Sequence, residues 1–272
     1  MAESYAKRYP GPGNRNFRTA GYHAAMDLSP NLLMLVIAVS FGSAIIGGMG
    51  GFGTGIILTA TLTPILGIKA VVPVLALSGI IINAGRFWFY RRDFDARAVK
   101  LVLPPALACL LGGTLIYQYL DAARLAIVIG LVVLAALPAR RHLAARRLNI
   151  GARGLAVGGG IFGFLNGIAS GMGVVLISLL LGAGLAGTAV LATDALVTIA
   201  IDVTRSALFG KLDLLAPSDV VLGGVIGISS LPGSWLASLL VRRLGHRLHI
   251  VIIETLIVAG GLSILFHGIR AL

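Results

Sequence analysis

The chain has 272 residues, of which 57% are hydrophobic and only 12% are charged. This composition excludes an ordinary soluble domain and predicts a multi-pass protein of a cell membrane. The net charge is +12, but most basic residues lie in the N-terminal segment and in short connections between apolar segments, which is the positive-inside pattern and indicates no nucleic-acid partner.

The apolar segments predict an all-α bundle. Residues 1–30 contain no continuous apolar stretch and predict a flexible polar tail. Because a membrane helix needs about 20 apolar residues, crossings are expected at residues 69–90, 99–120, 125–138, 186–209, 217–241 and 248–268. Two longer apolar regions, 32–66 and 155–184, are interrupted by glycines. Each of them predicts a broken helix or a re-entrant pair.

An internal duplication is visible at a period of about 120 residues. A shift of 119 places Asn83 on Asp202 and Arg86 on Arg205 (202 − 83 = 205 − 86 = 119). A shift of 120 superposes the glycine pairs Gly47/Gly167, Gly51/Gly171, Gly53/Gly173, Gly67/Gly187 and Gly113/Gly233. The predicted organisation is a membrane repeat over residues 31–138, a basic cytoplasmic linker over 139–153 and a second membrane repeat over 154–272.

The connections differ in basic charge, which bears on how the repeats are oriented. Residues 91–100, 140–153 and 242–247 are strongly basic, whereas Arg124 and Lys211 stand alone in theirs. If the three basic connections are cytoplasmic, each half has an odd number of crossings and the second repeat is inverted, with the basic tail outside. Counting each broken region as one crossing gives eight crossings, parallel repeats and an internal tail. We prefer inversion, and six crossings with re-entrant hairpins, eight or ten remain open.

The glycine tracts have two interpretations. Glycines recur every four residues at 47, 51 and 55 and at 159, 163, 167 and 171, which is typical of close helix packing. Alternatively, the tracts unwind the helices in mid-membrane and present backbone N–H groups and positive dipole ends to an anion. In the second case, the anion would contact Gly50, Gly51, Gly53, Ser170, Gly171 and Gly173.

Four charged residues lie inside apolar segments: Arg86, Asp194, Asp202 and Arg205. Each costs roughly 2.5–3.5 kcal/mol at a membrane-helix centre, so they must meet partners or a wet cavity. Asp202 and Arg205 can pair at i,i+3. Arg86 has only Asn83 within one turn, and it either lines the cavity or snorkels towards the basic connection that follows it.

The two arginines predict an oxyanion site. A guanidinium stays protonated and binds an oxyanion through two parallel hydrogen bonds, so Arg86 and Arg205, with Asn83, are expected to form a positive trap. Asp194 or Asp202 would carry a proton for coupling to a proton gradient. No metal site or cofactor is expected, because the histidines have no acidic or thiol cluster beside them.

The tract Gly47–Gly55 followed by Thr63–Gly67, and its second copy Gly167–Gly173 followed by Leu181–Gly187, resemble the sulfite exporter TauE/SafE family of membrane transporter proteins. The resemblance extends from about Leu33 to His267, and Gly184 stands where the first copy has Pro64. It implies passive or ion-coupled transport of small sulfur-containing anions such as sulfite, sulfoacetate or related organosulfonates, usually outward. The expected partners are the anion and membrane lipid, and a homodimer is left open.

Two rival functions use the same residues or the same membrane setting. An anion channel or an uptake permease for another small anion would need the same arginines. An intramembrane protease would need a serine with a histidine, or two aspartates on separate helices. Here both aspartates lie on one predicted helix and the apolar segments bury no histidine, so we expect no enzyme.

Overall fold

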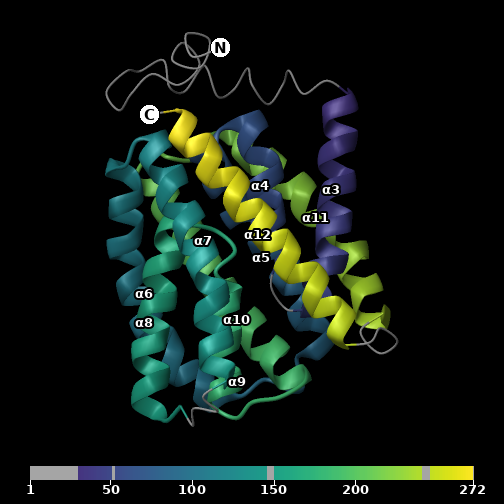
Figure 1. The fold of residues 1–272 in the computed structure, drawn as a ribbon, viewed down its shortest axis with the longest axis vertical. Helices are drawn as coiled ribbons and strands as arrows, with labels where there is room; N and C mark the ends of the chain where they lie inside the picture. Colours follow the sequence, from purple (N-terminus) through teal and green to yellow (C-terminus); the bar gives the residue numbers. More distant parts are fainter. Residues whose placement is uncertain (1–29, 51–52, 146–149, 241–245, 272) are drawn as a thin grey trace.

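The computed structural model describes residues 30–50, 53–145, 150–240 and 246–271, and within them the chain forms ten helices and no strand (Figure 1). This confirms the all-α prediction, while the predicted tail lies outside the described residues apart from Pro30. In chain order the helices are α3 (Pro30–Gly50), α4 (Thr54–Leu66), α5 (Ile68–Tyr90), α6 (Ala96–Tyr119), α7 (Ala122–Ala145), α8 (Ala152–Ile168), α9 (Gly173–Gly182), α10 (Thr188–Lys211), α11 (Pro217–Leu240) and α12 (His246–Arg270).

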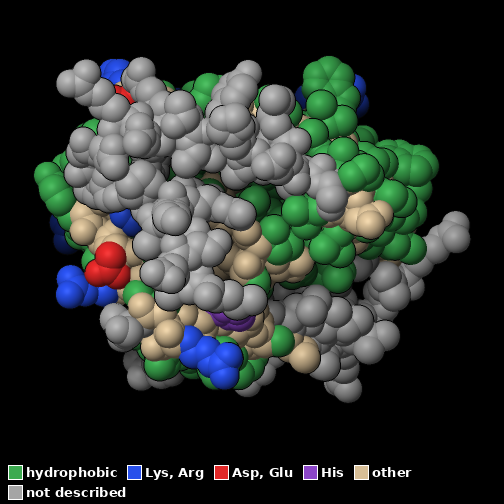
Figure 2. Space-filling model, turned by 90° about the horizontal axis from the view of Figure 1, so that it is seen from above, with side chains coloured by type: hydrophobic (Ala, Val, Ile, Leu, Met, Phe, Trp, Pro, Cys, Tyr) green, Lys and Arg blue, Asp and Glu red, His purple; other side chains and the backbone are tan. Residues whose placement is uncertain are grey.

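Four of these helices are long and apolar enough to cross a membrane, namely Pro30–Gly48 of α3, α5, α6 and α11. Their apolar residues face outward as well as inward, since Met34, Trp88 and Trp235 are exposed. A helix that is apolar all round lies either in a large protein core or in a membrane, and the exposure of these side chains favours the membrane. Viewed from above, hydrophobic side chains occupy much of the visible rim of the molecule (Figure 2).

Each of the two glycine-interrupted regions forms a pair of helices, as predicted. α3 ends at Gly50 and α4 begins at Thr54, with Gly53 at φ 109° before it. α8 ends at Ile168 and α9 begins at Gly173, with Gly171 at φ +88° in the break. Positive φ angles are accessible to glycine without steric cost. Glycine therefore sets the place where each helix stops.

Two helix ends differ from the prediction. α7 continues through Pro138 to Ala145 and enters the predicted linker, because proline is tolerated in membrane helices. α9 ends at Gly182, two residues before Gly184 at φ +91°, whereas α4 continues past Pro64 to Leu66. The second short helix is consequently shorter than the first.

The packing of the helices repeats between the two halves. α3 packs on α11, α8 packs on α6, α5 packs on α10 and α7 packs on α12. When α3, α4, α5, α6 and α7 are exchanged with α8, α9, α10, α11 and α12, this set of contacts maps onto itself. Each half therefore packs its first helix against the other half, and the two halves form one bundle.

Part of the glycine pattern serves this packing. A Cβ at Gly159 would lie 2.6 Å from Val102 O, and one at Gly167 would lie 2.6 Å from Leu110 O. Because both oxygens belong to the backbone of α6, only glycine lets α8 approach so closely. The packing interpretation is correct for Gly159, Gly163 and Gly167, whereas Gly171 of the same row lies in the break between α8 and α9.

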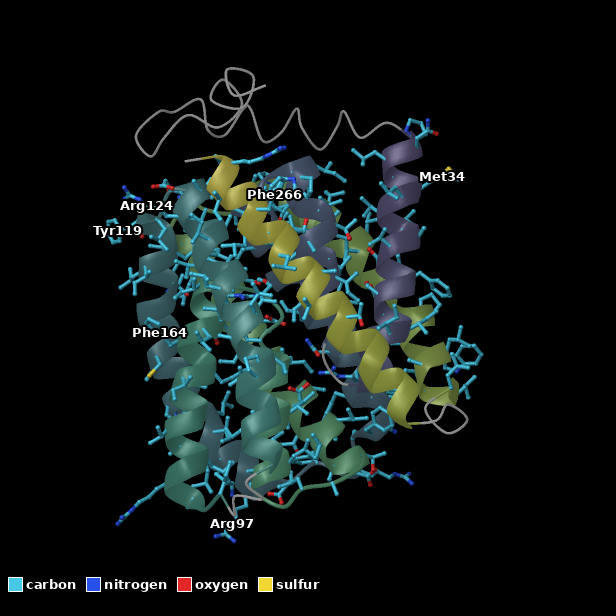
Figure 3. The ribbon with its side chains drawn as sticks, in the orientation of Figure 1. Met34, Arg97, Tyr119, Arg124, Phe164 and Phe266 are labelled. Atoms are coloured by element: carbon cyan, nitrogen blue, oxygen red, sulfur yellow. The ribbon has the colours of Figure 1, made fainter. Side chains whose placement is uncertain are left out.

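The two ends of the bundle can be followed in the figures. Arg97, in the strongly basic connection before α6, lies at the lower end in Figure 3, whereas Tyr119 and Arg124 lie near the upper end. α4 lies towards the upper end in Figure 1 and α9 towards the lower end. The two breaks meet inside the bundle, and the short helices that follow them lie towards different ends.

Candidate anion site

A cavity of about 80 Å³ lies between the two breaks and helices α5 and α10. It is larger than the space that a single water requires, and it suits a small ion of a few heavy atoms. The polar and charged side chains that line it are Thr54, Ser78, Asn83, Arg86, Asn166, Ser170, Asp194, Thr198, Asp202 and Arg205.

Most of the residues predicted for the site meet at this one cavity. Asn83, Arg86, Asp194, Asp202 and Arg205 line it together, and so do Gly53, Ser170, Gly171 and Gly173 of the breaks. Gly50 is the last residue of α3, next to the first break. Gly51 lies outside the described residues.

Arg86 forms an ion pair with Asp194 of α10, which decides between the two alternatives for Arg86. One terminal nitrogen of Arg86 donates to Asp194 Oδ2 and to Asn83 Oδ1, the latter at 2.8 Å. The Arg86 side chain is only 10% exposed and the Asp194 side chain is fully buried. Arg86 therefore does not snorkel, and Asp194 has a cation that its own helix does not supply.

Asp202 and Arg205 form the second ion pair, at 3.1 Å, as their i,i+3 spacing predicted. Asn83 connects the two pairs, because its Nδ2 donates to Asp202 Oδ2 at 3.4 Å while its Oδ1 accepts from Arg86. The two positive and two negative charges cancel. In this structure each guanidinium of the predicted positive trap faces a carboxylate.

Arg205 holds the end of the broken helix α8. One terminal nitrogen donates to Asn166 O at 2.6 Å and Ala169 O at 3.0 Å, and the other donates to Ser170 Oγ at 3.1 Å. The last carbonyls of a helix have no partner within the helix and carry partial negative charge. Arg205, which is 1% exposed, neutralises them through one terminal nitrogen, and its other terminal nitrogen binds Ser170 and Asp202.

The two breaks touch at the cavity. A Cβ on Gly55 would lie 2.8 Å from Gly171 Cα, and a Cβ on Gly171 would lie 2.8 Å from Ile56 N. No side chain larger than hydrogen fits between them. The first turns of α4 and α9 both begin here, and the N–H groups of a helix's first turn lack partners within the helix and favour an anion.

The family model described as Sulfite exporter TauE/SafE matches residues 36–264. The chain belongs to the TauE/SafE family. The matched region contains both breaks and every residue of the cavity. Comparisons with curated proteins and with solved structures give no match.

Membership of the TauE/SafE family implies a membrane transporter of sulfite-type anions. The cavity agrees with that class of substrate, since guanidinium and backbone N–H groups are the donors that oxyanions prefer. Within the described part of this TauE/SafE chain, no group of three or more His, Cys, Asp or Glu side chains could hold a metal ion.

Several lining residues of this TauE/SafE cavity were not predicted. Ser78 and Gly79 precede Arg86 by two turns on the same helix, and a Cβ on Gly79 would overlap the carboxylate of Asp202. Extending the helical periodicity of Asn83 and Arg86 backwards would have found both. Asn166 gives a weaker signal, as a single amide in a glycine-rich apolar segment.

Proposed function

We propose that this chain is a secondary transporter that exports small sulfur-containing oxyanions, such as sulfite or organosulfonates, across the bacterial inner membrane. The observation that carries the proposal is the convergence of two helix N-termini and two buried arginines on one cavity between the repeats. Discontinuous helices that meet at a binding site near the bilayer midplane are typical of secondary transporters.

The anion would bind against the first turns of α4 and α9, with Arg86 as its side-chain ligand. Arg205 would position the site, because it is bound to the end of α8. Sulfite, with one sulfur and three oxygens, is of a size that suits a cavity of about 80 Å³. A larger organosulfonate would require the two halves to move apart.

We also propose that the two repeats are inverted relative to each other and that transport exchanges their packing. Three features support the proposal: the contacts that map onto one another between the halves, the basic connections, and the position of α4 and α9 towards different ends of the bundle. Inverted repeats allow a fixed site to be reached alternately from either side by rocking one part against the other.

The test is flux in liposomes that contain the purified protein, with sulfite, sulfoacetate, sulfate and chloride compared under equal gradients. We expect saturable sulfite flux that is accelerated by sulfite on the far side. Arg86→Gln should abolish this flux, whereas Arg124→Gln, at an exposed ion pair, should not change it. Wild-type flux in Arg86→Gln would refute the site, and fast flux without acceleration would make the protein a channel.

A further inference from the structure

The charges around the cavity sum to zero before any anion enters. Arg86 and Arg205 are balanced by Asp194 and Asp202. The breaks add two helix N-termini, from α4 and α9, and two helix C-termini, from α3 and α8. Each N-terminus carries about half a positive charge and each C-terminus about half a negative charge. The helix dipoles therefore cancel as well.

An anion that binds in this cavity leaves an uncompensated negative charge in a buried place. Such a charge is costly in a membrane interior, and a protein relieves it by binding a counter-charge. A proton on one of the two carboxylates restores neutrality without moving any helix. The hydrogen bonds show which carboxylate is better suited to carry it.

Asp202 uses both of its oxygens as acceptors. Oδ1 accepts from Arg205 at 3.1 Å and Oδ2 accepts from Asn83 at 3.4 Å, so a proton on either oxygen would displace a donor. Asp194 is different, because Oδ2 accepts from Arg86 while Oδ1 has no hydrogen-bond partner among the described residues. A proton on Asp194 Oδ1 therefore displaces nothing.

The surroundings of Asp194 contain one charged contact. Arg86 of α5 faces it, Asp202 and Arg205 follow on its own helix, and α9 has no titratable residue. α6 and α8 also carry basic residues near their starts, namely Arg97, Lys100 and Arg153. All three are exposed. Thr198 Oγ1, one turn along α10, also has no partner within the described chain and provides an acceptor on the same face.

We infer that Asp194 binds a proton together with the transported anion, so that Arg86 exchanges the Asp194 carboxylate for the substrate. The inference rests on the proposed function and adds its coupling ion: one proton moves with each univalent anion, in the same direction. In the empty state Asp194 is ionised and holds Arg86. In the loaded state Asp194 is neutral and Arg86 holds the anion.

Cotransport of this stoichiometry is electroneutral, so the membrane potential does no work on it. The direction then follows from the anion gradient and the pH gradient alone. Outward transport requires an internal anion concentration high enough to exceed an opposing inward proton gradient. Such a transporter releases anion that has accumulated inside the cell, and net export stops when the internal concentration has fallen.

The experiment uses the full chain in liposomes with an internal pH dye and with the membrane potential clamped by potassium and valinomycin. Methanesulfonate is the probe, because its single charge does not change over the pH range, and sulfite is measured alongside. For wild type we expect one proton per methanesulfonate, flux independent of the clamped potential, and accumulation driven by an imposed pH gradient.

Asp194→Asn should still carry methanesulfonate, but without protons and with a flux that depends on the potential. Asp121→Asn, at an exposed position, should keep the proton stoichiometry, and a size-exclusion profile checks that each variant is folded. Anion flux without protons in wild type, or retained coupling in Asp194→Asn, overturns the inference and leaves the proposed function standing. No flux of any tested anion overturns both.

Discussion

The chain contains two Asp–Arg pairs with the same i,i+3 spacing and very different burial, which allows the role of Arg205 to be measured. Asp202 and Arg205 have side chains 5% and 1% exposed and lie 3.1 Å apart. Asp121 and Arg124 have side chains 52% and 71% exposed and lie 3.2 Å apart. The same substitution at both arginines therefore separates the effect of burial from the effect of helical spacing.

Arg205→Met leaves Asp202 as a buried carboxylate without its cation, and it removes the donors that bind Asn166 O and Ala169 O. Breaking a buried ion pair from one side costs about 3–5 kcal/mol. At roughly 2–4 °C per kcal/mol for chains of about this size, Tm should fall by roughly 6–20 °C. Arg124→Met breaks an exposed pair and should cost no more than about 1 kcal/mol.

The assay is thermal unfolding of the purified protein in detergent, followed by helical circular dichroism. Adding Asp202→Asn to Arg205→Met removes the isolated charge, so the double variant should regain at least about 1 kcal/mol. It should not regain everything, because the end of α8 still lacks its donors. Equal Tm values for Arg205→Met and Arg124→Met, or no recovery in the double variant, would refute this account of Arg205.

Two further predictions concern the cavity and the orientation of the repeats. Gly79→Ala forces a methyl group against the carboxylate of Asp202, and such overpacking costs about 1–3 kcal/mol of folding stability. The Tm of the purified variant should therefore fall by roughly 2–12 °C, while Gly224→Ala, with open space around it, should unfold like wild type. In a background without the native cysteine, Arg97→Cys should react with an impermeant thiol reagent only from the cytoplasmic side and Arg124→Cys only from the other side, and labelling of both from one side would contradict the proposed topology.

The two breaks were predictable because they depend on local properties. A helix that is apolar for longer than the membrane is thick and contains glycines at its centre has both a reason to stop and the residues that permit it. The structure places the ends of α3 and α8 and the starts of α4 and α9 within the regions that the sequence indicated. The pair Asp202–Arg205 was predictable for the same reason, since i,i+3 neighbours meet on any helix.

The partner of Arg86 was not predictable from the periodicity of its own helix. Asp194 is 108 residues away in the chain, and helical spacing identifies only neighbours within about one turn. The contacts of Arg205 with Asn166 O and Ala169 O could not be predicted either. Every residue has a backbone carbonyl, so the sequence does not indicate which carbonyl a distant side chain will bind. The sequence therefore overstated Arg205 as an open anion ligand.

The sequence by itself determined the membrane class, the positions of the two breaks and the need to shelter four buried charges. The membrane class follows from the composition of the whole chain. The other properties follow from the spacing of residues along a single helix, which involves only near neighbours. Only the tertiary structure decided how the charges pair, because α5 and α10 come from different halves and their contact depends on how the halves pack. That packing turns a predicted positive trap into a neutral network, with Asn83 between Arg86 and Asp202.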